Sequence, residues 1–222
     1  MDSQLGALLL ADARLPTGGH AHSAGLEPAL AAGLRPDEVP EYLHCRLRSV
    51  TLIDAAASVL ALRAARARPI RLGSIHDAVL ARTPTEPMRE ASGLLGRGLA
   101  RLASRWWPEH AAVVALAELG PRPQRPLALG VVAAAMGLDE QQVARACLYE
   151  DAQSVAAAAL KLLPVDPTDA AWWVLDAAGV IQESVTRAVD VTGTTDLPAV
   201  TAPLIEHGAL QHATRSRRIF VA

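Results

Sequence analysis

Two histidines separated by a single residue, His20 and His22, are the side chains of this 222-residue chain best suited to chemistry. Neutral imidazoles bind borderline metal ions, and Asp12 or Glu27 could supply a further ligand. Imidazoles in a loop also hydrogen-bond backbone, and the sequence favours that role because no cysteine stands near the pair. The other histidines of the central chain are dispersed over separate helical segments: His44, His76 and His110.

Motifs of the common catalytic classes do not occur in a suitable context. The sequence lacks a phosphate-binding G-x-x-x-x-G-K-[ST] loop, HExxH, GxSxG and a dinucleotide-binding GxGxxG. It also shows no nucleophile with a base beside it. The sequence therefore predicts that the protein is not an enzyme and has no cofactor and no stable metal site. The rival interpretation is a helical metal-binding protein or metal-dependent enzyme that uses His20 and His22.

The segment 8–30 positions these histidines by ending one helix and beginning another. Pro16 lacks an amide proton and biases the preceding residue away from helical angles, so a helix predicted over 4–13 ends before it. Gly18 and Gly19 allow a tight loop with positive φ. Ser23 is then expected to cap a second helix over 24–32, with Glu27 near the positive end of its dipole.

The composition predicts a helical core made of small side chains. Hydrophobic residues make up 51% of the chain, charged residues 20% and aromatic residues only 3%. Apolar residues recur at helical spacing from end to end, which predicts an all-α, single-domain bundle of about nine or ten helices over 1–222. A mean hydropathy of +0.20 without a membrane span indicates apolar surface hidden against another protein, hence an oligomer or obligate complex.

Charge and cysteine content narrow the partners and the compartment. The net charge of −2 and pI near 6.4 provide no field that would attract nucleic acid or an anionic membrane. The first residues lack the basic region and cleavage site of a signal peptide, so we expect a cytoplasmic protein. Cys45 and Cys147 have no CxxC spacing and are expected to be reduced, buried thiols.

Two long helical segments carry features that need a structural reason. In the region 37–68 the β-branched cluster of Val50, Thr51 and Ile53 could divide one helix into two, and Asp54 is expected to reach the edge of the apolar face. The segment 88–107 contains three glycines, each weakening a helix by about 1 kcal/mol relative to alanine. Close packing of this helix is therefore expected at Gly93, Gly96 and Gly98.

The helix predicted from Asp139 to Pro164 presents Arg145 and Tyr149 four residues apart, and so on one face. Arginine and tyrosine are enriched at interface hot spots, which favours a protein-binding face. The alternative is a solvated arginine packed on the tyrosine ring. Four apolar residues of this helix are expected to lie toward the core: Val143, Ala146, Val155 and Leu160.

The carboxy-terminal segment 212–222 combines basic residues with Ile219 and Phe220. It is too apolar for a fully solvated end. We expect it to dock against a partner or onto the surface of this fold.

The amino-terminal loop resembles a signature of the UreF family of urease accessory proteins, LP-x-GG-x-x-x-S-x-GLE. The matching residues are Pro16, Gly18, Gly19, His22, Ser23, Gly25, Leu26 and Glu27. One departure is His20, where the family usually carries an aromatic residue. Weaker resemblance continues at Ser92, Gly96 and Leu99, and in the tail at His212, Arg218 and Phe220.

The resemblance implies a non-enzymatic assembly factor for nickel urease. Such a protein forms a homodimer and bridges the accessory protein UreD, called UreH in some organisms, and the GTPase UreG. It thereby couples GTP hydrolysis to nickel insertion into apo-urease, and a transient nickel contact at His20 and His22 remains an alternative role for the pair. The residues expected to bind partners are Pro16, Gly18, Gly19, His22, Ser23, Glu27, Arg145, Tyr149, His212, Arg218 and Phe220.

Overall fold

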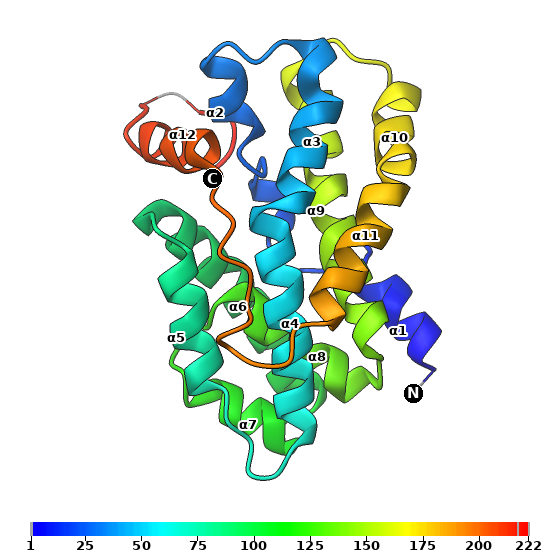
Figure 1. Cartoon of the computed structure of the whole chain (residues 1–222), viewed down its shortest axis with the longest axis vertical. Helices are drawn as coiled ribbons and strands as arrows, with labels where there is room; N and C mark the ends of the chain where they lie inside the picture. The colour runs from blue at the N-terminus through cyan, green and yellow to red at the C-terminus, as the bar shows by residue number, and fades with distance from the viewer. Residues whose placement is uncertain (1, 217, 222) are drawn as a thin grey trace.

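The computed structural model describes residues 2–216 and 218–221, and these residues form helices and connecting loops without a β-strand (Figure 1). The all-α, single-domain prediction is confirmed. The described chain contains two short 3-10 helices, η1 (Gly19–Ala21) and η2 (Pro36–Glu38), and twelve α-helices. The α-helices are α1 Ser3–Leu10, α2 Leu26–Ala31, α3 Val39–Arg48, α4 Val50–Arg66, α5 Gly73–Arg82, α6 Glu86–Trp106, α7 Ala111–Ala117, α8 Arg125–Met136, α9 Glu140–Leu162, α10 Pro167–Asp176, α11 Ala178–Val189 and α12 Pro203–Ala213.

The expected count of nine or ten was too low because two predicted helices are divided. Ser49 separates α3 from α4 with φ −118° and ψ −101°, and its hydroxyl donates to the Cys45 carbonyl at 2.7 Å. The β-branched cluster after Ser49 had indicated this break. The break between α10 and α11 falls at Ala177, which is fully buried and carries no residue type that signals a helix end.

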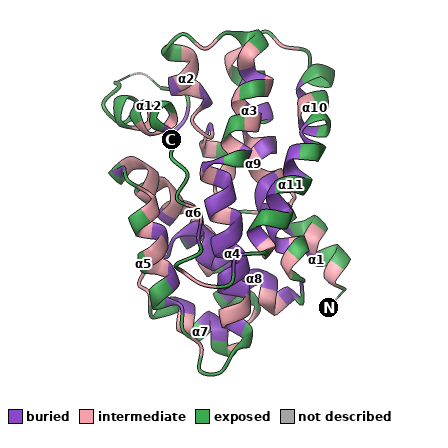
Figure 2. Ribbon diagram, viewed as in Figure 1, coloured by how far each residue is buried: buried purple, intermediate pink, exposed green. Residues whose placement is uncertain are grey.

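Helix α4 occupies the middle of the bundle and is buried along most of its length (Figures 1 and 2). It packs against α8, α9 and α11, and the remaining helices cover the outside of this group. The buried side chains of α4 are mainly Ala, Leu and Val. Small side chains let the helix axes approach closely, so a core almost without aromatic residues is still filled.

A long connection without regular structure, residues 190–202, joins α11 to α12 and is fixed by two arginines. Arg82 of α5 donates to the carbonyl groups of Thr194, Leu197 and Pro198 at 3.1 to 3.2 Å. Arg63 of α4 bonds the Val189 and Val191 carbonyls and also Glu140. These bonds satisfy backbone carbonyl groups that regular secondary structure does not pair.

The two helices around the amino-terminal loop are shorter than predicted. Helix α1 ends at Leu10, and Asp2, rather than Ser3, caps it by accepting the Gln4 amide proton at 2.9 Å. Helix α2 begins at Leu26 after Gly25, whose φ is +73°. Ser23 lies before the helix, and its hydroxyl oxygen still accepts the Glu27 amide proton at 3.5 Å.

Other predictions have mixed outcomes. Cys147 is buried as expected, whereas Cys45 is exposed and that expectation was wrong; neither forms a disulfide. Leu160 was predicted to lie toward the core, which is also wrong, because 43% of this residue is exposed. Within the described residues, none of the helices is both long enough and apolar enough to span a bilayer.

Candidate functional site: an amino-terminal loop joined to the tail, and the adjoining cavity

The glycine loop is shaped by backbone requirements that the sequence had indicated. Gly18 has φ +91°, a left-handed conformation that residues with a side chain rarely adopt. The loop rests on α6 at Gly98, where an added Cβ would lie 2.4 Å from the Thr17 carbonyl oxygen. Gly96 similarly admits the backbone of Pro123. These glycines therefore allow close packing as predicted, although the partners are connecting segments rather than helices.

Glu27 joins the loop to the carboxy-terminal tail. Its carboxylate accepts the backbone amide protons of Ile219 at 2.7 Å and Phe220 at 2.9 Å. The same group lies 3.1 Å from Nε2 of His212, the last-turn histidine of α12. Burial alone would raise the pKa of Glu27, but these hydrogen bonds outweigh it and the pKa is lowered.

The tail packs onto the loop in the described structure. Phe220 is 4% exposed and His212 is 3% exposed. The Lys161 ammonium lies 4.9 Å above the Phe220 ring and donates to the His20 carbonyl at 3.3 Å, and the Val221 amide donates to the Ala21 carbonyl at 2.9 Å. Loop, tail and the end of α9 thus form one continuous surface.

The histidine pair does not assemble a metal site with the proposed ligands. His20 is exposed, whereas His22 is half-buried, and burial followed by the nearby Arg125 charge lowers its pKa. Asp12 is engaged by Arg14, whose guanidinium approaches to 2.7 Å, and Glu27 is engaged by the tail. Among the described residues, no group of three or more His, Cys, Asp and Glu side chains comes together.

Arg145 and Tyr149 lie on α9, away from the end of this helix that contacts the tail. Arg145 is exposed and donates to Oε1 of Gln182 on α11 at 2.9 Å. The Tyr149 hydroxyl accepts from Gln153 at 2.7 Å while its ring packs partly against the core. Arg145 precedes Lys161 by 16 residues, or roughly 24 Å along a helix, so Arg145 lies far from the tail. Glu150, the residue after Tyr149, adjoins Gly19 of the loop.

A cavity of about 290 Å³ lies beside the loop and is lined mainly by α4, α6, α9 and α12. Predicted residues from three places reach it, namely Gly19 and His22 from the loop, His212 from α12 and Arg218 from the tail. One part of its wall is apolar, and the other is lined by charged side chains. The structure therefore brings four of the nine predicted loop and tail residues around one cavity.

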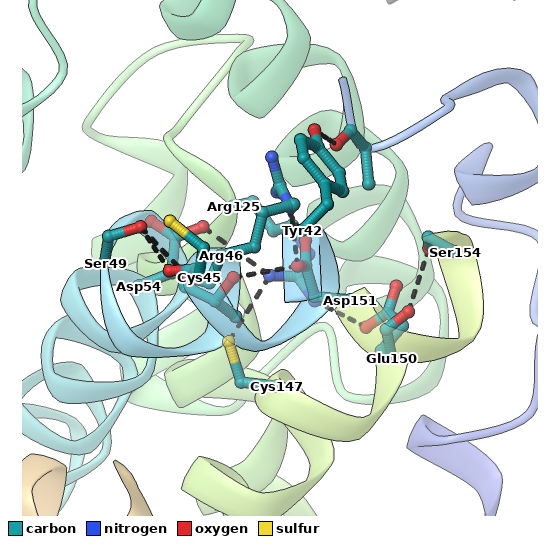
Figure 3. A network of polar contacts seen from close by, with 12 residues as sticks. Tyr42, Cys45, Arg46, Ser49, Asp54, Arg125, Cys147, Glu150, Asp151 and Ser154 are labelled. Carbon is teal, nitrogen blue, oxygen red and sulfur yellow. Dashed lines mark hydrogen bonds and ion pairs between the residues drawn. The ribbon is translucent and has the colours of Figure 1, made fainter. Parts of the chain in front are cut away.

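The charged wall is a network of buried ion pairs (Figure 3). Arg46 of α3 binds Asp151 of α9 through two hydrogen bonds of 2.7 and 2.9 Å, and Thr51 donates to the same carboxylate at 2.8 Å. Arg125 of α8 donates to Glu150 at 2.7 Å and lies 3.7 Å from Asp54. The network links four helices through side chains that a purely hydrophobic core would not require.

Burial raises the pKa of a carboxyl group, whereas pairing with an arginine lowers it. Burial would raise the pKa of Asp151, but Arg46 and the bonds around it outweigh that effect and lower it. Burial raises the pKa of Asp54 to about 6, only partly opposed by Arg125. Burial likewise raises the pKa of the Cys147 thiol to about 12, so this cysteine stays protonated at neutral pH.

This network was not predicted from the sequence. A signal was present, because Arg46 falls between the buried leucines Leu43 and Leu47, and Arg125 opens the apolar helix α8. Charges in such places are costly unless paired. Their partners on α9 could not be identified, because pairing depends on how helices more than 20 residues apart are oriented.

Comparison with known proteins identifies the family. The UreF family model matches residues 35–178. The urease accessory protein UreF of Mycobacterium sp. strain JLS is 37% identical over 218 residues, covering 97% of both chains. Those of Mycolicibacterium vanbaalenii and Mycobacterium marinum are 35% and 36% identical, covering 100% and 97% of both chains respectively. The chain belongs to the UreF family.

The UreF family assignment confirms the resemblance drawn from the sequence. The family model begins at residue 35, after the glycine loop, whereas the M. vanbaalenii UreF aligns with the whole chain. Loop and tail therefore lie within the part of the chain shared with a UreF relative. The relatives are accessory proteins by name rather than enzymes.

Proposed function

We propose that this protein is a cytoplasmic assembly scaffold for nickel urease. It bridges UreD, or UreH, and the GTPase UreG, and it couples GTP hydrolysis to nickel insertion into apo-urease. Family membership supports a role in urease maturation, because the similar proteins are named urease accessory proteins. In this role the protein binds partners through its surfaces and catalyses no reaction itself.

The observation that carries the proposal is the junction of loop and tail at Glu27. Two segments expected to bind partners are ordered against one another by three contacts to one carboxylate. A partner that contacts this surface meets both segments at once. The exposed side chains there include Ile219 and Arg218, which offer apolar and basic contacts on the same patch.

Arg145 and Tyr149 are the proposed contact for the GTPase. The Gln182 bond ties the arginine of α9 to α11, and the Gln153 bond holds the tyrosine. Side chains already held in one rotamer lose less conformational entropy when a partner binds. The distance between Arg145 and the tail suits a protein that holds two partners together.

A homodimer is the proposed oligomeric state. Several helices carry exposed large apolar side chains, and two of them carry a pair of comparable exposure: Leu5 and Leu8 on α1, and Trp172 and Leu175 on α10. Leu8 is 71% exposed and Trp172 60%. Side chains of this size left in water are candidates for burial between two copies of the chain.

A three-component pull-down tests the bridging role. Tagged UreD is immobilised and offered UreG with GTP, with and without this protein. We expect UreG to be retained only when this protein is present and retained itself. Retention of UreG by UreD alone, or failure of this protein to bind either component, would contradict the proposal.

A further inference from the structure

The charged groups in the inner wall of the cavity are unequally paired. Two guanidinium groups, from Arg46 and Arg125, face three carboxylates, from Asp54, Glu150 and Asp151. Arg46 is paired with Asp151 and Arg125 with Glu150 at hydrogen-bond distance. Asp54 is the carboxylate left over, because the structure gives it only the 3.7 Å approach of Arg125.

With Arg82, Arg218 and Glu90 included, the lining holds four guanidinium groups and four carboxylates, but neither Arg82 nor Arg218 bonds to Asp54. The Arg82 guanidinium is held by carbonyl groups of the connection before α12, and Arg218 donates to the Val221 carbonyl. From α6, Glu90 adds a further carboxylate at the lining, and His212 is turned to Glu27. Burial lowers the pKa of His22, which also lines the cavity, so its imidazole adds no positive charge at neutral pH.

Asp54 is open to the cavity rather than sealed in the core. About a third of its side chain, 32%, is exposed, while the Arg125 side chain beside it is only 8% exposed. No hydrogen bond to the Asp54 carboxylate occurs within the described residues, so its oxygens can accept from a ligand. The neutral His22 imidazole in the same lining can accept a further bond.

The rest of the lining is suited to an alkyl chain. Val50 and Ile53 lie on the turn of α4 before Asp54, and Leu94 and Leu95 of α6 line the cavity as well. A volume of about 290 Å³ accommodates one small molecule or one long side chain. A doubly charged metal ion is a poor match, since no three ligating side chains converge among the described residues.

We infer that this cavity binds a monovalent organic cation, an alkylammonium or alkylguanidinium group, whose head pairs with Asp54 and whose alkyl stem lies along Val50, Ile53 and Leu95. Such a group could belong to a free small molecule or to a lysine or arginine side chain of a bound protein. The inference rests on the cavity alone and does not depend on the proposed urease partners.

The test uses the full-length protein and N-butylguanidinium chloride, with n-butylurea as its uncharged counterpart of similar shape. Binding is followed at pH 7.5 by amide chemical shifts of Ile53 and Leu95. We expect saturable binding of the cation and at least tenfold weaker binding to Asp54→Asn. Glu183→Gln, which changes an exposed carboxylate on α11, is the matched control and should bind like the parent.

Two further arms complete the test. Ala209→Leu narrows the cavity from α12 without altering its charges and should also lose binding of the cation. This second variant keeps the inference testable if Asp54→Asn does not fold. A capped Gly-Gly-Arg-Gly-Gly peptide distinguishes the sources: binding indicates a protein side chain, and binding of the small cation alone indicates a free ligand. Equal affinity for n-butylurea, equal binding by Asp54→Asn, or absence of cation binding to the parent would overturn the inference.

Discussion

The backbone amide of Phe220 donates to the Glu27 carboxylate at 2.9 Å, which connects residues 193 positions apart in the chain. Ile219 donates to the other oxygen of the same carboxylate, so the glutamate holds two consecutive amides. A carboxylate that accepts two backbone bonds in a partly buried place is a strong anchor. Glu27 therefore fixes the tail on the loop.

Replacing Glu27 by Gln should release the tail. The amide keeps one acceptor oxygen but loses the charge, so we expect the free energy of unfolding to fall by about 1 to 2 kcal/mol. Hydrogen exchange at the Ile219 and Phe220 amides should accelerate at least tenfold, while amides of α4 keep their relative protection. Glu183→Gln is the control, and unchanged exchange in the tail would show that Glu27 does not anchor it.

Asp54 should make the protein less stable as the pH rises from about 4 to 6. Its pKa is about 6 when folded against a reference of 3.8, so the native state binds more protons than the unfolded state in that window. The stabilisation that proton binding at Asp54 provides is complete below the unfolded pKa of 3.8. It is lost as the pH rises through the folded pKa of about 6. The full shift corresponds to roughly 3 kcal/mol, which solvent screening reduces to about 1 to 2 kcal/mol.

The variant Asp54→Asn removes that dependence. We expect its free energy of unfolding to exceed that of the parent by about 1 to 2 kcal/mol at pH 7.5 and to match it near pH 4. Urea unfolding at both pH values measures the difference. The exposed Glu41→Gln serves as control, and an Asp54→Asn variant that is less stable than the parent at pH 7.5 would refute the assignment.

Gly98 should tolerate no side chain. An added Cβ would lie 2.4 Å from the Thr17 carbonyl oxygen, so Gly98→Ala must displace the loop or α6. We expect a loss of about 1 to 3 kcal/mol in the free energy of unfolding. Gly179→Ala in α11 is the matched control: nothing lies within 4 Å of its added Cβ, and helix propensity predicts a gain of up to about 1 kcal/mol. Equal effects of the two substitutions would contradict the packing.

Arg145→Ala and Tyr149→Ala should weaken GTPase recruitment while the fold remains intact. Hot-spot side chains contribute about 2 kcal/mol or more, so we expect a loss in affinity of roughly 30-fold for each variant. Circular dichroism and thermal unfolding check the fold, and titration with UreG measures affinity. Arg101→Ala, which changes an exposed residue of α6, is the control. Parent-like affinity for UreG in both α9 variants would show that this face does not bind the GTPase.

The proposed homodimer is tested at its exposed apolar side chains. Leu5→Glu with Leu8→Glu alters α1, and Trp172→Glu with Leu175→Glu alters α10. We expect the parent to sediment as a dimer and at least one double variant as a folded monomer, because a charge buried at an interface is costly. A monomeric parent, or two double variants that both remain dimeric, would show that these faces do not form the dimer.

Local features of the fold could be predicted from the sequence because they depend on nearby residues. Pro16 and Gly18 determine the loop, and Asp139 caps α9 by accepting the Gln142 amide proton, as its position indicated. Helical periodicity likewise predicted the all-α class. The break at Ala177 could not be predicted, because an alanine favours helix and only packing within the bundle ends α10 there.

The site was only partly predictable for the same reason. Glu27, His212 and Phe220 were each expected to bind a partner, but the sequence did not indicate that they contact one another. The pairs of Arg46 with Asp151 and Arg125 with Glu150 depend on the relative orientation of α3, α8 and α9. Lys161, which covers the Phe220 ring, was missed because a lysine near a helix end is usually solvated.

The proposed role as an assembly scaffold is tested most directly by the nickel content of urease. Apo-urease is incubated with UreD, UreG, GTP and nickel, with or without this protein, and bound nickel is measured after removal of free metal. We predict nickel-loaded, active urease only when this protein is present and GTP can be hydrolysed. Equal nickel loading in its absence would contradict the role of this UreF family member as an assembly scaffold.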